Sequence, residues 1–570
     1  MGMYSSIYTA KSGMMAFSQG TNVIGDNLAN SNTVGFKGST LLFSDVMTRA
    51  AGAKSFHAAQ AAAGVRLAKV GRDMRQGQVE HTTNGTDMAI SGAGMFALRD
   101  PVSGNTFYSR AGHFLLDKNF KLVNEQGMIV QGWQKSATGA TIGTKPVDID
   151  IGLFSGASPA DLANNRIVIA ATPSTTANIG VTLPANAVRP SAPLFDPNDP
   201  TSYNFKTDLV LFDANGTKHT TSLYFVKQGM DANGNAVWDW HLSVKGDELT
   251  GGTANDANTQ VEVGGSSYTS GAALPAGTLP QGTVIAPSTT LSAAVTGAFT
   301  LIDQNGNSAA IPAGAWTAGT TLAAVAANAG LANTGFYRIG SGGITVPAAT
   351  VGGTSPLIQL PATPSTVTGG VVDPAVATAQ RLEFDGTGAL VNEYAPTVSI
   401  PWNGAAAGAI SLNMGSATTI DAQGTTGTGT DGTLQVGDAF AATSVTSDGY
   451  AQGTLDRLET DATGVIYGLF TNGRRVPLAQ VALAAFGNPA ALERMGGNLL
   501  QASAASGKAT MQAPTTGGMG TIIGSGLEQS NVDLGDEFVK LIVLQRSFEA
   551  NSKSLTTTDQ MLSMLAQLKR

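Results

Sequence analysis

A seven-residue repeat of apolar side chains at each end of the chain most constrains how it can fold. Near the N-terminus the spacing alternates between four and three, and only Thr21 is not apolar in the series Met3, Ile7, Ala10, Met14, Phe17, Thr21, Ile24 and Leu28. Near the C-terminus Leu534, Leu541, Phe548, Leu555 and Leu562 recur every seven residues, and the same side carries Phe538, Leu544 and Leu565. Such spacing puts one narrow apolar stripe along a helix, as in coiled coils. The sequence therefore predicts a long helix at each terminus.

Residues beside these stripes set the expected ends and strength of the helices. Ser530 and Asp533 are good N-cap residues, which indicates that the C-terminal helix begins close to them. In the N-terminal helix, Gly13 and Gly20 each lower intrinsic helix stability by about 1 kcal/mol relative to Ala. The N-terminal helix is therefore weak by local propensity alone.

Two interpretations of the terminal helices remain open. They are either ordinary amphipathic helices packed on a globular core, or helices that pair with each other and with neighbouring subunits. Burial of one narrow stripe does not offset the entropy of ordering each backbone segment. We therefore favour helices that become ordered on assembly.

Between the ends, the composition favours β-structure. The chain has 570 residues, of which 42% are hydrophobic and only 13% charged, and it contains 71 Gly. This length is too great for one core, and a Gly-rich, weakly charged composition favours short strands and turns. We predict a mainly β multidomain chain with long α-helices at both termini. Its β domains should be nested and discontinuous, and its terminal helices should form a coiled-coil domain on assembly.

Charge and cysteine content exclude several classes of function. The formal net charge is −8 and no run of five Lys or Arg residues occurs, so nucleic acid is not an expected partner. The chain has no Cys and hence no disulfides or thiolate metal sites. No apolar run reaches the length of a membrane span, and the N-terminal residues lack the continuous apolar stretch of a cleaved signal peptide. We therefore expect neither membrane insertion nor signal cleavage.

Short motifs that imitate enzyme sites do not meet the requirements of those sites. GTGTDG at 427–432 matches a dinucleotide fingerprint by chance in a Gly-rich chain, with no helix predicted after it. DANGNA at 231–236 lacks the Gly and the Glu of a calcium loop, and SGKAT at 506–510 is an incomplete phosphate loop. The five His residues lack metal-ligand spacing. We predict no catalytic residues, no cofactor and no metal.

Two terminal motifs carry a resemblance to a known family. The N-terminal IGDNLANSNTVGFKGS and the C-terminal GLEQSNVDLGDEFVKLIVLQRSFEANSKSLTTTDQML resemble the paired terminal signatures of bacterial flagellar axial proteins, and most closely those of flagellar hook proteins. Inward segments such as QGQVEHTTNGTDMAISGAGMFAL and NPAALERMGGNLLQASAASGKA extend the likeness. Together these cover about the first 150 and last 130 residues.

This resemblance implies a structural subunit of the bacterial flagellar hook. Such a subunit polymerises into a flexible helical tube that transmits torque from the motor rod to the filament. The implied partners are further copies in a helical homopolymer, rod and hook-filament junction proteins, the hook cap and the flagellar export apparatus. The implied location is extracellular, in the hook region, after export without signal cleavage. The alternatives are a distal rod or junction protein of the same axis, or a β-domain surface adhesin.

The segment that follows the first helix carries a separate signature. Asn and Gly residues there favour a helix end and a turn, with Phe36 as a packing anchor. The resemblance implies that the segment leads from the inner tube to the first globular domain and contacts adjacent subunits. The signature residues are Asn27, Asn30, Asn32, Gly35, Phe36 and Lys37.

The predicted domains are nested around the middle of the chain. Within them, TDLVLFDANGTKHTTSLYFVK is expected to form a hairpin, and Asn472 with Gly473 suits a type I′ turn. The domains comprise a terminal helical domain (1–30 and 530–570), a linker (31–69), a first β domain (70–150 and 440–524), a second β domain (151–250 and 380–439) and an inserted outer domain (251–379).

Overall fold

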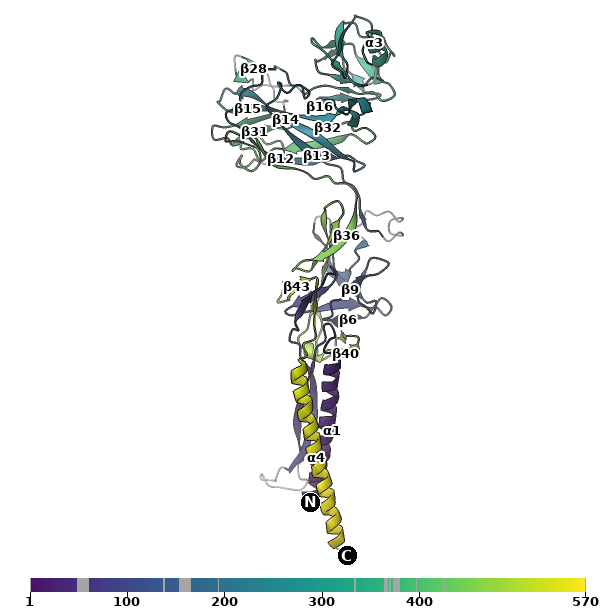
Figure 1. Ribbon diagram of the computed structural model, residues 1–570, viewed down its shortest axis with the longest axis vertical. Coiled ribbons are helices and arrows are strands. Elements are labelled where there is room, and N and C mark those ends of the chain that lie inside the picture. Colours follow the sequence, from purple (N-terminus) through teal and green to yellow (C-terminus); the bar gives the residue numbers. More distant parts are fainter. Residues whose placement is uncertain are drawn as a thin grey trace. The chain divides into compact units, whose positions relative to one another are not determined.

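The computed structural model divides the chain into two compact units (Figure 1). Unit 1 comprises Met1–Ile169 and Gly453–Arg570, and unit 2 comprises Ala170–Gln452. The structure describes residues 2–48, 61–136, 139–152, 166–192, 194–332, 335–362, 367–368, 371–372, 380–395, 397–424 and 426–568.

Unit 1 contains the two long helices predicted at the termini. α1 spans Gly2–Ala29 and α4 spans Leu534–Leu568, and the two lie side by side (Figure 1). Asp533 caps α4, because its Oδ1 accepts hydrogen bonds from the backbone N–H groups of Gly535 (2.8 Å) and Asp536 (3.2 Å). The remainder of the described chain is mostly β-structure, so the predicted fold class of a mainly β chain with terminal helices is confirmed.

A β-hairpin packs along α1 where the sequence predicted a linker. β1 (Ser39–Thr48) and β2 (Ala61–Arg72) pair antiparallel, with Ser39 opposite Arg72. The backbone N–H of Val65 donates to Ser12 Oγ in α1 (3.1 Å). The linker prediction for 31–69 is therefore wrong over the two strands. Backbone pairing between distant residues stabilises them, and this pairing is not visible in local composition.

The β domain of unit 1 joins strands from both halves of the chain. β9 pairs with β38, and β5 pairs with β39. The largest sheet follows the path β11 (Val168–Ile169), β36 (Gly453–Thr460), β37 (Val465–Phe470), β38 (Arg475–Val481), β9 (Ile129–Lys135), β5 (Met95–Arg99), β6 (Thr106–Ser109), β41 (Leu499–Gln501) and β40 (Glu493–Gly496). Attached to this path are β7 (Leu115–Leu116), β8 (Leu122–Val123), β10 (Thr141–Asp148), β39 (Leu483–Ala485) and β42 (Thr510–Gln512). Two short ladders join β3 (Val79–His81) to β44 (Gly526–Glu528) and β4 (Met88–Ser91) to β43 (Thr521–Gly524).

The turn between β37 and β38 differs from the predicted type I′ turn. Gly473 N–H donates to the Phe470 carbonyl (2.9 Å), and Phe470 N–H donates to the Arg474 carbonyl (2.9 Å). Of the two central residues only Gly473 has a positive φ, of 78°. Because type I′ needs positive φ at both positions, the prediction is wrong, and the turn is a type I turn followed by a Gly bulge.

Unit 2 contains a second β domain with two sheets around a large apolar core. The predicted hairpin at 207–227 is confirmed by the antiparallel pairing of β13 with β14. The first sheet contains β13 (Phe205–Phe212), β14 (Lys218–Met230), β15 (Ala236–Lys245), β16 (Gln260–Val263), β28 (Val367–Thr368), β29 (Val371–Val372), β30 (Arg381–Phe384) and β31 (Leu390–Tyr394). The second contains β12 (Thr176–Leu183), β32 (Val398–Ile400), β33 (Gly408–Asn413), β34 (Leu434–Gln435) and β35 (Ala441–Ser447).

A smaller lobe follows β16 within unit 2. It has its own core around Trp316 and a short helix, α3 (Leu322–Asn328). Its main sheet contains β17 (Ser267–Tyr268), β27 (Ile358–Gln359), β20 (Val284–Ile285), β24 (Tyr337–Ile339), β22 (Phe299–Ile302) and β23 (Ser308–Ile311). Shorter ladders contain β18 (Ala273–Leu274), β26 (Ala349–Gly352), β21 (Thr290–Leu291), β19 (Gly277–Leu279) and β25 (Ile344–Val346).

Strand pairing moves four of the predicted domain boundaries. β11 pairs with β36 in the sheet of the first β domain, although the second β domain was predicted to begin at residue 151. β16 pairs with β15, and β29 pairs with β14, so both belong to the sheet of the second β domain rather than to an insertion over 251–379. β35 pairs with β12 in unit 2, although the first β domain was predicted to resume at residue 440. The strands that lead into and out of the lobe meet where Leu360 N–H donates to the Ser266 carbonyl (3.0 Å).

Candidate assembly surface and helix–domain junction

The two terminal helices contact each other in antiparallel order at seven-residue intervals. The Asn27 amide donates to Glu537 Oε2 at 3.0 Å, and both side chains are buried. A Cβ atom added to Gly20 or Gly13 would lie only 2.9 Å from the facing side chain. The three contacts are Asn27 with Glu537, Gly20 with Leu544, and Gly13 with Asn551. The two glycines therefore allow a close approach of the helices, at the cost in helix propensity that the sequence indicated.

The observed contact stripe on α1 only partly follows the predicted one. Ala10 and Ile24 are buried as the pattern indicates, and the half-buried Phe17 packs edge to face on Phe43 of β1 (centroids 5.8 Å apart). The other contacts use Gly13, Gly20 and Asn27, each one residue before a predicted position. The side chains of Ile7, Met14, Thr21 and Leu28 are half-buried, and that of Met3 lies outside the described part. The seven-residue spacing of Gly13 and Gly20 was the available signal for this stripe.

On α4, some residues of the predicted stripe are buried or half-buried and others are exposed to solvent. Leu544 is buried, and Leu541, Leu555 and Leu562 are half-buried. Leu534 and Phe548 are 46% and 40% exposed. The Leu565 side chain lies outside the described part of the chain. The predicted stripe is therefore only partly covered within one chain.

Four apolar side chains of α4 remain uncovered, of which Phe538 belongs to the predicted stripe. They occupy the side of the helix opposite Glu537 and Leu544, and each is between 53% and 62% exposed. We call this set the α4 apolar face; it consists of Phe538, Val539, Ile542 and Val543. An exposed contiguous apolar patch on a helix is typical of a protein–protein contact.

A buried carboxylate joins the segment after α1 to the β domain and to the strand before α4. Glu528 is fully buried, and its Oε1 accepts from Lys37 Nζ at 2.7 Å and from the Gly77 N–H at 2.8 Å. Arg110 Nη1 donates to Glu528 Oε2 at 3.2 Å. Burial lowers the pKa of Lys37 and of Arg110, and the Glu528 carboxylate opposes this shift. One carboxylate thus binds two cations from separate segments.

Backbone contacts fix the same junction. Gly35 has φ of 68°, and an added Cβ there would lie 2.4 Å from the Ala111 nitrogen, so only Gly fits. Gly35 N–H donates to the Glu528 carbonyl at 2.6 Å. Asn531 Oδ1 accepts from the Gly38 N–H at 2.8 Å, and its amide donates to the carbonyls of Asp73 and Arg75, both at 3.0 Å. The N-terminal and C-terminal motifs therefore meet in one site.

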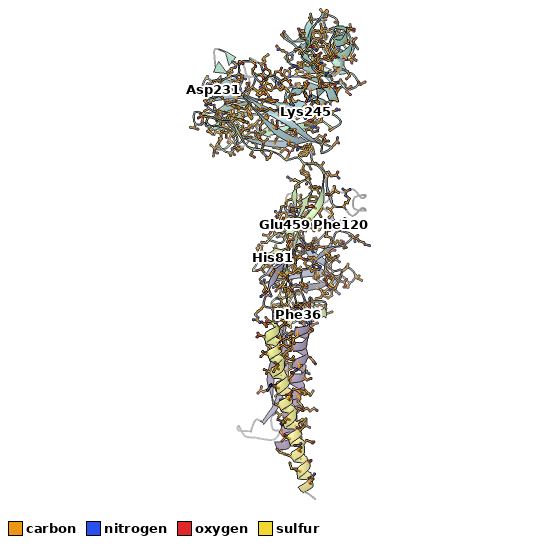
Figure 2. The ribbon with its side chains drawn as sticks, viewed as in Figure 1. Phe36, His81, Phe120, Asp231, Lys245 and Glu459 are labelled. Atoms are coloured by element: carbon orange, nitrogen blue, oxygen red, sulfur yellow. The ribbon has the colours of Figure 1, made fainter. Side chains whose placement is uncertain are left out.

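The aromatic residue of the signature is also held in place at the junction. Phe36 is buried (labelled in Figure 2), and the Arg494 guanidinium lies 4.9 Å from its ring centroid. Arg494 also donates to Asp26 Oδ2 (2.8 Å) and to the Lys37 carbonyl (3.1 Å). Residues 26–37 are thereby tied to the β40–β41 hairpin.

The three Asn residues of the signature differ in role. Asn30 matches the helix-end prediction, because its amide donates to the Asp26 carbonyl at 2.9 Å. Asn27 instead exchanges two hydrogen bonds with the Ser39 backbone (2.8 and 2.9 Å) and reaches Glu537, so it links α1, β1 and α4. Asn32 is exposed. The role of Asn27 depends on tertiary contacts that the sequence pattern alone does not show.

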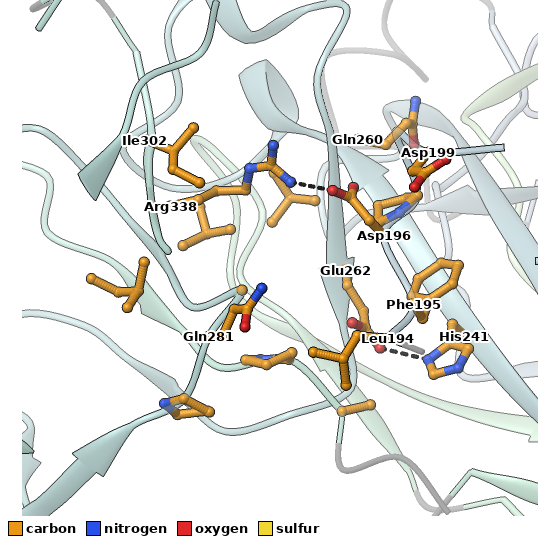
Figure 3. Close-up of a pocket in the computed structure, with 18 residues that line it drawn as sticks. Leu194, Phe195, Asp196, Asp199, His241, Gln260, Glu262, Gln281, Ile302 and Arg338 are labelled. Carbon is orange, nitrogen blue, oxygen red and sulfur yellow. Dashed lines mark hydrogen bonds and ion pairs between the residues drawn. The ribbon is translucent and has the colours of Figure 1, made fainter. Parts of the chain in front are cut away.

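A cleft in unit 2 lies between the second β domain and the lobe (Figure 3). Its volume is about 510 Å³. Asp196 accepts from Arg338 Nη1 at 2.6 Å, and His241 Nδ1 lies 2.7 Å from Glu262 Oε1. Within the described ranges, no group of three or more His, Asp or Glu residues is arranged to hold a metal ion. The ion pair joins residues 194–199 to the lobe.

The DANGNA segment forms a hairpin turn rather than a ligand loop. Asp231 Oδ1 (Asp231 is labelled in Figure 2) accepts from the backbone N–H groups of Asn233 (2.8 Å) and Asn235 (2.7 Å). This is the usual role of Asp in a turn between strands, here β14 and β15. No helix in the described part of the chain is long and apolar enough to cross a membrane.

Four flagellar family profiles match successive parts of the chain. Residues 7–37 match the flagella basal body rod protein family, and 89–187 match the flagellar hook protein FlgE/F/G D1 domain. Residues 182–333 match the flagellar basal body protein FlaE D2 domain, and 525–568 match the flagellar basal body rod FlgEFG protein C-terminal family. The two terminal matches coincide with the helices and the junction.

The chain is also similar over its full length to proteins that are named flagellar hook protein FlgE. Flagellar hook protein FlgE of Salmonella typhimurium is 27% identical, over 99% of this chain and 100% of its own length. Flagellar hook protein FlgE of Caulobacter vibrioides is 28% identical, over the whole of both chains. The crystal structure of Helicobacter pylori flagellar hook protein FlgE2 aligns at 13% identity and a TM-score of 0.34, covering 79% of this chain and 100% of that one. That superposition is too loose to bear on the fold.

The helices, the junction and the matched profiles together define a class, the axial structural proteins of the bacterial flagellum. Within that class, the chain belongs to the flagellar hook protein family and is a structural subunit of the hook. Proteins of this family are part of the flagellum outside the cell.

Proposed function

We propose that this chain polymerises into the hook tube through the α4 apolar face, which packs against α1 and α4 of neighbouring subunits. This proposal rests on the exposure of the α4 apolar face, although α1 already covers the other side of α4. The exposed residues are Phe538, Val539, Ile542 and Val543. On α1, Tyr8 and Met15 are 67% and 58% exposed and offer apolar surface to such neighbours. Burial of these side chains on assembly would supply the free energy that the isolated helices lack.

The symmetry of the contact determines the form of the assembly. A patch on α4 that packs on a different patch of the next copy makes a heterologous contact. Contacts of this kind form a ring if the rotation closes and a helical filament if it does not. We infer an open helical tube with the terminal helices along its inner wall, in agreement with the hook names of the relatives.

The junction would carry load between the helices and the β domain. Lys37 and Arg110 are buried and each pairs with the buried Glu528, and Asn27 links α1 to α4. A joint of several buried, directional hydrogen bonds resists rotation better than an apolar contact, which has no preferred direction. We infer that torque passes through this joint as the tube turns.

The partners and the route to the assembly are further parts of the proposal. We infer contacts with rod and hook-filament junction proteins, the hook cap and the flagellar export apparatus, and export without a cleaved signal peptide. We also infer a non-enzymatic role. These inferences rest on the family names of the relatives and on the matched rod-family termini.

The smaller lobe would tune flexure rather than hold the tube together. The Asp196–Arg338 pair joins the lobe to residues 194–199 beside the cleft in Figure 3. Loss of that pair should let the lobe move while the helices and junction stay intact. We expect Arg338→Gln to give tubes of normal length with altered curvature in electron micrographs. Unchanged curvature and stiffness would indicate that the lobe is a passive surface decoration.

The test of polymerisation is a charged substitution on the α4 apolar face. We expect Val539→Asp with Ile542→Asp to prevent tube formation, because each Asp would have to be buried without a partner at every subunit contact. Tubes would be counted in electron micrographs of purified, concentrated protein. Val102→Asp is the matched control, because Val102 is 93% exposed in the turn between β5 and β6. This variant should form tubes normally. Normal tubes from the double variant would remove the α4 apolar face from the mechanism.

A further inference from the structure

An open cavity of about 230 Å³ lies at the helix–domain junction of unit 1. Its walls come from the end of α1, residues 35–37, the end of β2, the β domain and the β40–β41 hairpin. The cavity is large enough for several water molecules or one small ion. It lies where the terminal helices meet the β domain.

Positive charge predominates at this cavity. Asp26 and Glu528 supply two negative charges, and four cationic side chains reach the cavity wall: Lys37, Arg72, Arg110 and Arg494. Lys37 and Arg110 share the Glu528 carboxylate, and Arg494 pairs with Asp26 at 2.8 Å. Among these six side chains the cations outnumber the carboxylates by two, although Asp73 also interacts with Lys37 from nearby.

Arg72 differs from the other three cations, because no carboxylate in the described part of the chain pairs with it. Its Nη1 atom is buried, and no hydrogen bond or ion pair connects its side chain to another residue in the described ranges. Burial and the neighbouring Arg494 charge lower the Arg72 pKa to about 10, which still leaves it charged at neutral pH. The Arg72 side chain is half-buried, and burial of one of its guanidinium nitrogens without a partner costs free energy that an anion in the cavity would offset.

We propose that this cavity is an oxyanion-binding site in which Arg72 and Arg494 hold a carboxylate or phosphate group. The guanidinium fork suits the paired oxygens of either group. The group is either an acidic side chain of a neighbouring copy or a free anion such as inorganic phosphate. Both sources present the same chemistry to the same two arginines.

Binding of inorganic phosphate to the full-length chain tests the site without assembly. The titration would be done at constant ionic strength and at a protein concentration where the chain sediments as a monomer. We expect millimolar binding and a rise in the melting temperature with phosphate concentration. Arg72→Gln should weaken binding about tenfold or more, because it removes a charge-assisted hydrogen bond.

Arg75→Gln is the matched control. Arg75 lies three residues from Arg72, pairs with Asp73 at the surface, and is not part of the cavity wall. We expect the Arg75→Gln variant to bind phosphate with the same affinity as the unchanged chain. Equal binding by the Arg72→Gln variant and the unchanged chain, or no binding by the unchanged chain, would overturn the proposal. Neither result would bear on polymerisation.

The same titration on sedimented tubes distinguishes the two sources. If a neighbour's carboxylate fills the cavity, tubes should no longer bind phosphate, and Arg72→Gln tubes should dissociate at lower salt concentration than unchanged ones. If a free anion fills it, tubes should bind phosphate with the affinity of the monomer. Either result supports an oxyanion site and assigns its source.

Discussion

The terminal helices and the core of unit 2 differ in how completely they bury their large side chains. In unit 2, Trp238, Trp240 and Trp402 are at most 1% exposed, and they pack in one continuous core. On α4, the four residues of the apolar face are more than half exposed. A β domain of this kind completes its core within one chain, whereas the helix pair has apolar surface that no described part of the chain covers.

The residues at the contacts differ in the same way. The core of unit 2 combines Trp and Phe side chains with many Leu, Val and Ile side chains, while α1 meets α4 through Gly13 and Gly20. Small residues allow close backbone approach but bury little apolar area per contact. From this difference we expect unit 2 to be stable as a monomer and the helix pair to gain stability from neighbouring subunits.

The largest effect should come from removing an aromatic side chain of unit 2. We expect Trp240→Ala to lower the free energy of unfolding of unit 2 by about 3–5 kcal/mol, because it leaves a cavity in a closed core. Urea unfolding followed by fluorescence suits this test, since only one of the five Trp residues, Trp133, lies in unit 1. Phe538→Ala on the apolar face should change the free energy of unfolding of unit 1, followed by the fluorescence of Trp133, by less than about 0.5 kcal/mol. Equal losses would contradict the comparison.

A smaller effect is expected at the junction. Glu528→Gln removes the charge shared by two buried cations, so we expect a loss of about 3 kcal/mol in the stability of unit 1. Limited proteolysis should then release residues 2–37 earlier than in the unchanged chain. Glu80→Gln is the control, because Glu80 is exposed on β3, which pairs with the strand that carries Glu528. An unchanged rate of release would exclude a structural role for the buried carboxylate.

A pH effect on stability is expected in unit 2. Burial lowers the pKa of Lys227 from 10.5 to about 8, with its Nζ 5.0 Å from the Trp238 ring centroid. Between these two values the unfolded chain binds more protons than the folded one, so stability should rise as pH increases from about 8 to 10.5. The urea midpoint of unit 2 should therefore increase over this range, and Lys227→Met should abolish the increase. A midpoint that falls in the unchanged chain would contradict the burial of Lys227.

The smallest effect concerns the lobe. The Arg338 and Asp196 side chains are 29% and 34% exposed, so their ion pair should contribute less than about 1 kcal/mol. Arg338→Gln should hardly change the melting temperature of unit 2, and its effect should appear only in the curvature of tubes. A loss of several degrees would mean that the lobe is part of the core of unit 2 rather than an adjustable attachment.

The sequence predicted best what depends on local periodicity. The spacing from Met3 to Leu28 and from Leu534 onward identified both helices, and Asp533 identified the start of α4. The β1–β2 hairpin and the pairing of β16 with β15 were missed, because they depend on contacts between distant backbone segments. The periodicity also predicted large apolar residues at the contact between the helices. In the structure the helices lie so close together that Gly13 and Gly20 occupy this contact instead.

Of the candidate junction site, the residue types were predicted but their partners were not. Gly35 and Phe36 have the turn and packing roles that their chemistry indicates. The pairing of Lys37 with Glu528 joins residues 491 positions apart, and no local pattern specifies it. Arg72 was missed altogether, because an unpaired cation is recognisable only after its surroundings are known.

Hydrogen exchange in monomers and tubes most directly tests the claim that the helices are completed by assembly. We expect the amides of α4 to exchange rapidly in the monomer and to become strongly protected in tubes, because neighbours cover the α4 apolar face. The amides of β15, which carries Trp238 and Trp240, should be protected to the same extent in both states. If α4 is as well protected in the monomer as β15, the helix pair is complete within one chain and the account is contradicted.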